Sequence, residues 1–128
     1  MKLIAVILAS VSLLPLAAAD VSLVDNDETI TVDCAADPNV SIMGNHATVT
    51  LTGTCMQVSV SGNHATVIGS AAAVSIAGNH NTATLDGVDA LSVSGNDNTV
   101  TYRKPVNAKL KKPKISNWGN DNTITRTK

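Results

Sequence analysis

Three histidines recur along the chain and are the side chains best suited to chemistry. His46, His64 and His80 each follow an Asn, and Asp27 and Asp97 take the same place in neighbouring copies of the pattern. Imidazole and carboxylate groups are ligands that Zn²⁺, Cu²⁺ and Ni²⁺ accept. If the copies stack about 5 Å apart, adjacent histidines can share one transition-metal ion. A pH-sensitive file of imidazoles and an inert, solvent-facing turn are the alternatives.

A basic insertion near the C-terminal end is the second candidate. From Asp20 to Val100 the chain has nine carboxylates and no Lys or Arg, whereas from Thr101 onward it has eight bases and one Asp. The insertion at 103–114 holds six of these bases, which are Arg103, Lys104, Lys109, Lys111, Lys112 and Lys114. Such a loop can bind an anionic envelope polymer or a lipid surface. Nucleic acid is not expected, because no aromatic residues are interleaved for stacking on bases.

The same charge pattern allows two further interpretations. Lysines at an open sheet edge discourage the addition of another strand, so the insertion can serve as edge protection alone. The opposite charges of the two ends also allow head-to-tail self-association of rods, which would build open filaments.

No arrangement of residues indicates catalysis. Acid–base chemistry needs groups that converge on one place, whereas Ser, His and Asp recur here through the repeat alone. Asp86 and Asp89 lie in a variable stretch that is typical of a turn. We therefore expect no enzyme activity and no cofactor.

The elements that position these residues follow from an internal repeat. The pattern aliphatic-Ser-x-x-[Gly/Asp]-Asn-x-x-Thr-[Val/Ile/Ala] occurs six times, with spacings between successive Asn of 19, 18, 16, 17 and 24 residues. The aligned Asn residues form the expected structural turn column and are Asn26, Asn45, Asn63, Asn79, Asn96 and Asn120. A period of this size is typical of a solenoid, in which a single coil cannot bury its apolar side alone.

One copy, 58–67, shows the expected shape of a coil. Val58 and Val60 alternate with Ser, as in a strand with one buried face. Gly62-Asn63 tolerates the positive φ of a turn, and a second short strand follows. The chain has no Phe, which favours a thin interior of Val, Ile and Leu over a sandwich core. The sequence therefore predicts an all-β, single-domain β-solenoid, similar to a parallel β-helix, of about six coils of 16–24 residues.

A repeated Thr-x-Thr pattern predicts a flat outer face. On a regular solenoid these threonines form two parallel files, with Ile68 replacing one Thr. This grid resembles the face of β-solenoid ice-binding proteins, which implies binding of ice or ordered water. The alternative is that Thr is simply a favourable strand residue on an exposed face.

The first 19 residues are predicted to be a cleaved secretory signal peptide. Met1-Lys2 gives a minimal positive region, an apolar run extends from Leu3 to Leu16, and Ala17-Ala18-Ala19 precedes Asp20. The run is shorter than a transmembrane span of about 20 residues. We expect a mature solenoid domain at 20–128 that has no transmembrane segment and is secreted, with a periplasmic or extracellular location.

Export makes a disulfide between the two cysteines plausible. Cys34 and Cys55 fall at the same corner of adjacent coils if the strands stack in register. An oxidising compartment then favours a bond between them, and two free thiols are the alternative.

Two segments carry a resemblance to a known family. The phrase Val-Ser-Gly-Asn-Asp-Asn-Thr-Val-Thr at 93–101, echoed at 118–125, resembles the secreted bacterial domain of unknown function 3060 family, whose members repeat Gly-Asn-x-Asn-Thr-[Val/Ile]. The resemblance covers about 40–125 and implies an exported, solenoid-like envelope protein with no established activity. The chain departs from the pattern at Ala47 and Ala65, where Asn98 and Asn122 carry the family residue.

A weaker likeness is to the curlin repeats of bacterial amyloid fibres, through the segment 62–67. Curlin repeats also depend on regularly spaced Gln, and Gln57 is the only Gln in this chain.

These observations predict a non-catalytic exported envelope or extracellular protein with a structural or adhesive role. The alternative is a ligand-binding module that uses the basic insertion or the histidines. Ice binding through the Thr face is a further alternative.

Overall fold

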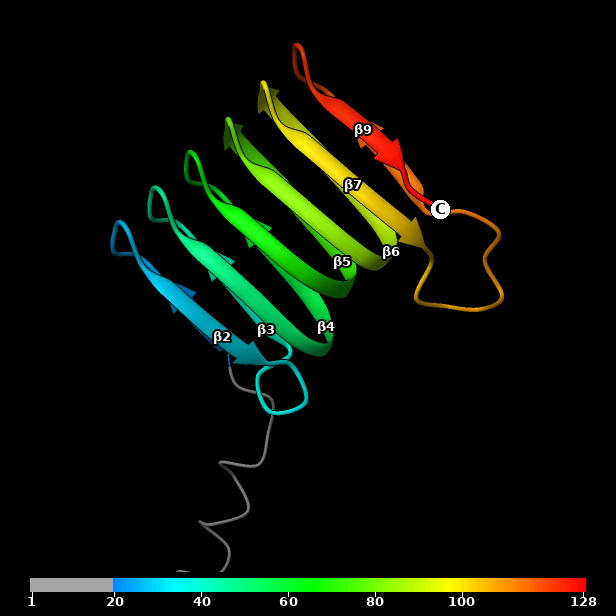
Figure 1. Cartoon of the computed structure of the whole chain (residues 1–128), viewed down its shortest axis with the longest axis horizontal. Coiled ribbons are helices and arrows are strands. Elements are labelled where there is room, and N and C mark those ends of the chain that lie inside the picture. Colours follow the sequence, from blue (N-terminus) through cyan, green and yellow to red (C-terminus); the bar gives the residue numbers. More distant parts are fainter. Residues whose placement is uncertain (1–19) are drawn as a thin grey trace, which may run out of the picture.

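The computed structural model describes residues 20–128, and the predicted signal peptide lies outside the described residues. Within them, nine parallel-paired strands wind into an all-β solenoid of about five turns (Figure 1). The strands are β1 (Asp20–Leu23), β2 (Thr29–Asp33), β3 (Asn39–Ile42), β4 (Thr48–Val60), β5 (Thr66–Asn79), β6 (Thr82–Asn96), β7 (Thr99–Lys104), β8 (Lys114–Asn117) and β9 (Thr123–Arg126). The predicted β-solenoid is confirmed. Its six repeats make about five turns because the sixth begins with β8 and does not complete a coil.

The interior of the solenoid is one layer of stacked aliphatic side chains. Val58 pairs with Val40 below it and with Val74 above it, and all three are buried. The two inward files expected from the repeat are in register, and they are Val21, Val40, Val58, Val74, Leu91, Ile115 and Ile30, Val49, Val67, Ala83, Val100, Ile124. Each fully buried side chain of this kind stabilises the fold by about 1.5–3 kcal/mol, so the register is strongly specified.

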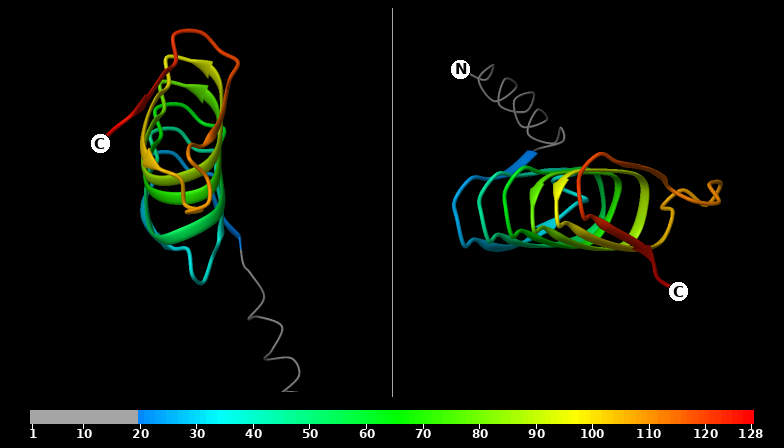
Figure 2. Two further views of the ribbon diagram at one scale, coloured as in Figure 1. Left: turned by 90° about the vertical axis from the view of Figure 1, so that its right-hand side faces the viewer. Right: turned by 90° about the horizontal axis from the view of Figure 1, so that it is seen from above.

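Three strands are longer than the sequence predicts. β4, β5 and β6 contain 13, 14 and 15 residues, and each passes from one face of the solenoid to the other without a break. Asp86 and Asp89, expected in a turn, therefore lie within β6. Parallel pairing continues around this corner, and register shifts such as the one between Gly69 and Ser70 provide the bend. Two further views of the ribbon show the flattened coils that result (Figure 2).

The two ends of the stack differ. Near the first coil, the expected disulfide joins Cys34 to Cys55 across 21 residues of chain, with the Cα atoms 4.7 Å apart. In the last coil, Asn117 takes an inward position opposite Val93, and Trp118 beside it is 80% exposed. Within residues 20–128 no helical segment has the length and apolarity that a membrane crossing requires.

Candidate functional site

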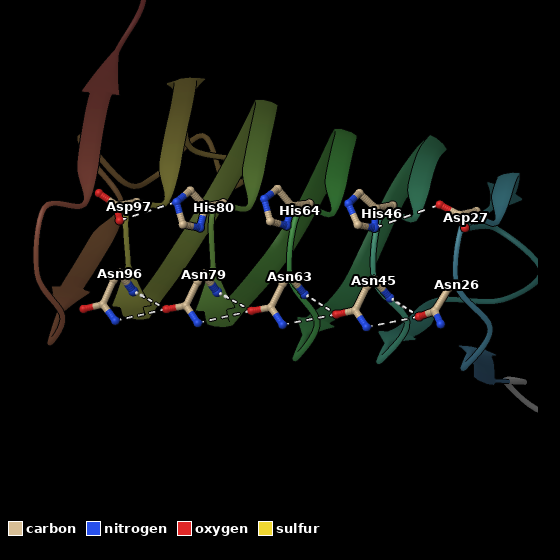
Figure 3. A pocket seen from close by; sticks show the side chains of 10 residues that line it. All are labelled: Asn26, Asp27, Asn45, His46, Asn63, His64, Asn79, His80, Asn96 and Asp97. Carbon is tan, nitrogen blue, oxygen red and sulfur yellow. Dashed lines mark hydrogen bonds and ion pairs between the residues drawn. The ribbon is translucent and has the colours of Figure 1, made fainter.

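A shallow groove runs along the sharp corner of the solenoid, where each repeat turns between its two strands. One side of the groove is a file of Asn, and the other is a file of His and Asp (Figure 3). The groove has a volume of about 620 Å³ and is lined by Asn26, Asp27, Asn45, His46, Asn63, His64, Asn79, His80, Asn96 and Asp97. The fold therefore brings the three predicted histidines together with two carboxylates on one surface.

The Asn file is a hydrogen-bonded ladder. Asn63 donates from Nδ2 to Oδ1 of Asn45 at 3.2 Å, and its backbone N–H donates to the same oxygen at 3.0 Å. The same pair of bonds joins Asn45 to Asn26, Asn79 to Asn63 and Asn96 to Asn79. Each hydrogen bond contributes about 1 kcal/mol. Because the next turn occupies the Oδ1 atoms of Asn26, Asn45, Asn63 and Asn79, this file holds the turns in register rather than facing a ligand.

The residue after each ladder Asn, and not the Asn itself, has the positive φ. His46 and His64 have φ values of 60° and 58°, and the full file is Asp27, His46, His64, His80, Asp97 and Asp121. The expectation that Gly62-Asn63 supplies the left-handed turn is therefore wrong in this detail. Asp and His, like Asn, tolerate this conformation better than other residues with side chains. The left-handed backbone conformation therefore favours residue types such as His and Asp in this column, independently of any ligand.

Backbone hydrogen bonds hold this file rigidly in place. The N–H of His46 donates to the carbonyl of Asn63 at 2.9 Å, and the N–H of His64 donates to the carbonyl of Asn79 at 3.0 Å. The imidazole rings therefore start from backbone positions that repeat from turn to turn, while the rings themselves are exposed to solvent.

The three imidazole rings stack face to face. The ring centroids of His46 and His64 are 4.9 Å apart with the planes 10° from parallel, and those of His64 and His80 are 5.0 Å apart at 3°. A carboxylate closes each end of the file: Nδ1 of His46 lies 4.0 Å from Oδ1 of Asp27, and Nε2 of His80 lies 3.6 Å from Oδ2 of Asp97 (Figure 3). Among residues 20–128, no group of three or more His, Cys, Asp or Glu side chains is placed so that it could hold a metal ion.

A second Asn file lies inside the corner, two residues after the ladder. Asn98 is fully buried, and its Oδ1 accepts the N–H of Asn81 at 2.9 Å. Its Nδ2 donates to the carbonyl of Gly78 at 2.9 Å and to Oδ1 of Asn122 at 3.1 Å. Earlier turns have Ala at this position, as at Ala65. These buried amides satisfy backbone groups of the corner, so their role is structural.

The basic insertion forms a loop that projects from the opposite corner, between β7 and β8 (Figures 1 and 2). Two carboxylates of β6 anchor it. Oδ1 of Asp86 lies 3.1 Å from Nη1 of Arg103, and Oδ1 of Asp89 accepts the N–H of Asn107 at 2.9 Å. Pro113 is buried at the end of the loop. Asp86 and Asp89 therefore position the loop.

The loop combines charge with apolar side chains, of which Val106 lies at its base against Gly87 of β6. Leu110 is 41% exposed and Val106 is 38% exposed. The N–H of Leu110 donates to the carbonyl of Asn107 at 3.0 Å, which turns the chain at this point. The lysines of the same segment are all exposed, and they are Lys104, Lys109, Lys111, Lys112 and Lys114. Of the six predicted anion-binding residues, Arg103 differs, because its guanidinium is paired with Asp86.

Stacking of the last two coils brings Arg126 and Lys128 next to the start of the basic insertion. This proximity was not predicted from the sequence. β9 pairs with β7 so that Arg126 lies opposite Tyr102. Nε of Arg126 donates to the carbonyl of Arg103 at 3.0 Å. A hollow of about 440 Å³ results, and it is lined by Arg103, Lys104, Arg126, Thr127 and Lys128. The long stretch of sequence between the two groups conceals this proximity.

The threonines of the repeat are in register on one face, as expected. The two files are Thr29, Thr48, Thr66, Thr82, Thr99, Thr123 and Thr31, Thr50, Ile68, Thr84, Thr101, Thr125. Ile68, which interrupts the second file, is 43% exposed.

Comparison of the sequence with known protein families matches most of the residues described above to one family. The family described as "Protein of unknown function (DUF3060)" matches residues 42–69 and 62–121, which together exceed half of the chain. The match includes the three histidines and the basic loop. The likeness to curlin repeats is not confirmed. No curated protein and no solved structure matches the chain.

Proposed function

The chain belongs to the family of proteins of unknown function DUF3060, and from its surfaces we propose that it is a non-catalytic exported protein with an adhesive role. It attaches to an anionic surface of the cell envelope through its basic end, and the solenoid serves as a rigid body that projects from that surface.

The gathering of positive charge at one end of the rod is the observation that carries this proposal. The hollow brings Arg103 and Lys104 together with Arg126 and Lys128, and the other four bases of 103–114 follow in the loop that continues from Lys104. The preceding turns, 20–100, contain carboxylates and no Lys or Arg. Such a charge distribution attracts an anionic partner to one end of the molecule and repels it from the other.

The apolar side chains of the loop favour a lipid surface over a charged polymer. Leu110 is exposed between Lys109 and Lys111 in the sequence, and Val106 is partly exposed at the anchored base of the loop. Lysines near an anionic bilayer each contribute about 1 kcal/mol, and apolar side chains gain further when they enter the headgroup region. A polysaccharide or another anionic polymer would use the lysines and leave Leu110 in water.

Two observations support the exported and non-catalytic parts of the proposal. The disulfide between Cys34 and Cys55 is of the kind that persists in oxidising compartments. The His and Asp side chains of the corner groove are spread along a file, one per turn, rather than converging on one point. General acid–base chemistry depends on such convergence.

Co-sedimentation with vesicles tests the attachment. We expect the oxidised protein to bind vesicles that contain anionic phosphatidylglycerol and not vesicles of phosphatidylcholine alone. Replacing Lys109, Lys111 and Lys112 by Gln removes three charges and should weaken binding by roughly 100-fold. Leu110→Ser should also weaken binding to vesicles, while binding to a soluble polyanion such as dextran sulfate should not change.

A matched control separates local from overall charge. Thr29→Glu, Thr31→Glu and Ser61→Glu lower the net charge by the same amount at exposed positions in turns that precede the loop. This triple variant should bind vesicles almost as well as the parent protein. Equal losses in both triple variants, or equal effects of Leu110→Ser on vesicles and on the polyanion, would contradict attachment to lipid through the loop.

The flat Thr face supports a second candidate, binding of ice or ordered water. Two in-register files of hydroxyl and methyl groups repeat at about 4.8 Å between strands and about 6.6 Å along each strand. Ile68→Thr completes the second file at an exposed position, so it should increase inhibition of ice recrystallisation. The control is Thr82→Lys, which interrupts the first file and should decrease it. If neither the parent protein nor Ile68→Thr inhibits recrystallisation, this candidate is wrong.

A further inference from the structure

Hydrogen bonds between the last coil and β7 hold the hollow beside the basic insertion in shape. The backbone N–H of Thr127 donates to the carbonyl of Tyr102 at 2.7 Å, and the hydroxyl of Thr127 donates to the same oxygen at 3.3 Å. Nε of Arg126 donates to the carbonyl of Arg103 at 3.0 Å. These bonds fix the end of β9 against β7, and the last of them also orients the guanidinium of Arg126.

The Arg126 guanidinium keeps most of its donors available for a ligand. Arginine has five N–H donors in a planar fork, and the Nε–H is the one that bonds to Arg103. Across residues 20–128, the Arg126 side chain forms no ion pair with a carboxylate. Its Nη atoms can therefore make the two-pronged contact that guanidinium groups make with phosphate oxygens.

The charges around the hollow favour an anion with more than one negative charge. Arg103, Lys104, Arg126 and Lys128 line it, and no Asp or Glu does. Asp86 offsets the charge of Arg103, because its Oδ1 lies 3.1 Å from Nη1. Three positive charges remain, of which a carboxylate ligand would offset only one. A phosphate monoester carries a charge of about −1.5 to −2 at pH 7 and has three strong acceptor oxygens.

From this geometry we propose that the hollow binds a phosphate monoester. The guanidinium of Arg126 contacts two phosphate oxygens, and Lys104 and Lys128 supply further positive charge. The volume of about 440 Å³ is in the range of about 300–1,000 Å³ that small-molecule sites occupy. The inference rests on the proposed attachment through the basic end, because it names the chemical group that this end selects. The group belongs either to a lipid headgroup or to a soluble ester, and two measurements separate these sources.

Titration of the oxidised, nitrogen-15-labelled protein with glycerol 3-phosphate tests the site itself. We expect one ester per chain, with shifts of the Arg126 Nε–H and of the Thr127 backbone N–H. Arg126→Gln removes the guanidinium fork and should weaken binding by about 10-fold or more. Lys104→Gln is the second variant, because Lys104 is exposed and its side chain takes no part in the bonds that hold the last coil. It should weaken binding by roughly 3-fold or more.

Lys111→Gln is the matched control for Lys104→Gln. It removes the same charge from an exposed position of the loop that does not line the hollow, and it should change the affinity for glycerol 3-phosphate by less than about 2-fold. Circular dichroism checks the fold of each variant. The inference is overturned if glycerol 3-phosphate moves no signal of the hollow, or if Lys111→Gln weakens binding as much as Lys104→Gln.

Vesicles of phosphatidylcholine with either phosphatidic acid or phosphatidylglycerol distinguish the two sources. At equal surface charge, tighter binding to phosphatidic acid, whose headgroup is a monoester, identifies a lipid as the ligand, and Arg126→Gln should abolish this preference. Equal binding to both, with glycerol 3-phosphate bound in the hollow, identifies a soluble ester.

The same measurements separate this inference from the proposed attachment. Binding of glycerol 3-phosphate without binding to either anionic vesicle would support the site and contradict the attachment. Binding to phosphatidylglycerol vesicles through the loop lysines, with no binding of glycerol 3-phosphate, would support the attachment and contradict the site.

Discussion

Gly44 lies one turn above Asp25, so close to its carbonyl oxygen that a β-carbon at Gly44 would overlap this atom. The relationship repeats along the corner: Gly62 meets the carbonyl of Gly44, and Gly78 meets that of Gly62. The turns are thus stacked backbone on backbone at this position. Glycine is required here by the close approach, although Gly44, Gly62 and Gly78 do not have a positive φ.

This stacking predicts that Gly62→Ala is severely destabilising. The new methyl group would overlap the carbonyl oxygen of Gly44, and backbone atoms cannot move away without breaking the ladder on both sides. We expect the free energy of unfolding to fall by roughly 3 kcal/mol or more. Urea unfolding followed by circular dichroism measures this change.

Gly53→Asn is the control for this prediction. Gly53 has a φ of 75°, which Asn tolerates, and the nearest atom to a β-carbon there is the N of Ala35 at 3.9 Å. Its stability should stay within about 1 kcal/mol of the parent protein. If Gly62→Ala and Gly53→Asn lower the free energy of unfolding by similar amounts, overlap with the Gly44 carbonyl is not the cause.

In the first described coil, the residue that corresponds to Gly44, Gly62 and Gly78 is Asp25. Its side chain opposes head-to-tail association of two copies. Asp25 takes the place of the glycine, so in-register stacking on the last coil of another copy would bring its β-carbon onto the carbonyl of Gly119. Asp27 would also come to lie beside Asp121, because both belong to the left-handed file. The attraction between the acidic and basic ends is therefore opposed by steric overlap and by like charges.

We accordingly expect the protein to sediment as a monomer. The double variant Asp25→Gly and Asp27→Asn removes both obstacles and should associate at high protein concentration. Analytical ultracentrifugation at low salt, where the opposite charges of the ends are least screened, is the measurement. Filaments of the parent protein under these conditions would contradict the prediction.

The buried Asn file should contribute more to stability than the exposed ladder. Asn98→Ala removes the acceptor of the buried Asn81 N–H and the donor to the part-buried Gly78 carbonyl. We expect a loss of about 1–3 kcal/mol, because the Asn81 N–H is left without a partner away from water. Asn96→Ala removes the side-chain donor to Oδ1 of Asn79 and the acceptor of the Asn120 side chain at an exposed site, and it should have a smaller effect. Thermal unfolding of the two variants compares them, and an equal or larger effect at Asn96 would count against this account.

Reduction of the disulfide should destabilise the first two coils. The bond between Cys34 and Cys55 closes a loop across 21 residues, which contributes about 3 kcal/mol in the chain-entropy model. Adding dithiothreitol should therefore lower the melting temperature by several degrees. The double variant Cys34→Ser and Cys55→Ser should melt at the lower temperature with or without the reductant. A melting temperature that dithiothreitol leaves unchanged would show that the bond does not stabilise the fold.

Much of the fold follows from local patterns in the sequence. Val58 and Val60 alternate with serines, and this alternation predicts a strand whose valine face is buried and whose serine face is not. The repeat then places equivalent residues on successive turns, which predicts the inward files and the pairing of Cys34 with Cys55. Both are confirmed. The long strands around the second corner were not predicted, because segments such as Gly69 to Ala73 have no periodic pattern of their own.

For the candidate sites, too, some properties follow from the sequence and others only from the tertiary structure. The sequence determined by itself that His46, His64 and His80 share one file, because position in a repeat is a matter of counting. Only the tertiary structure decided that these residues have the left-handed conformation, that their rings stack, and that one carboxylate lies closer than the other. These properties depend on hydrogen bonds and side-chain packing between turns that are 16 or more residues apart. The hollow that joins Arg103 to Arg126 has the same origin, since stacked coils bring together residues that no local pattern relates.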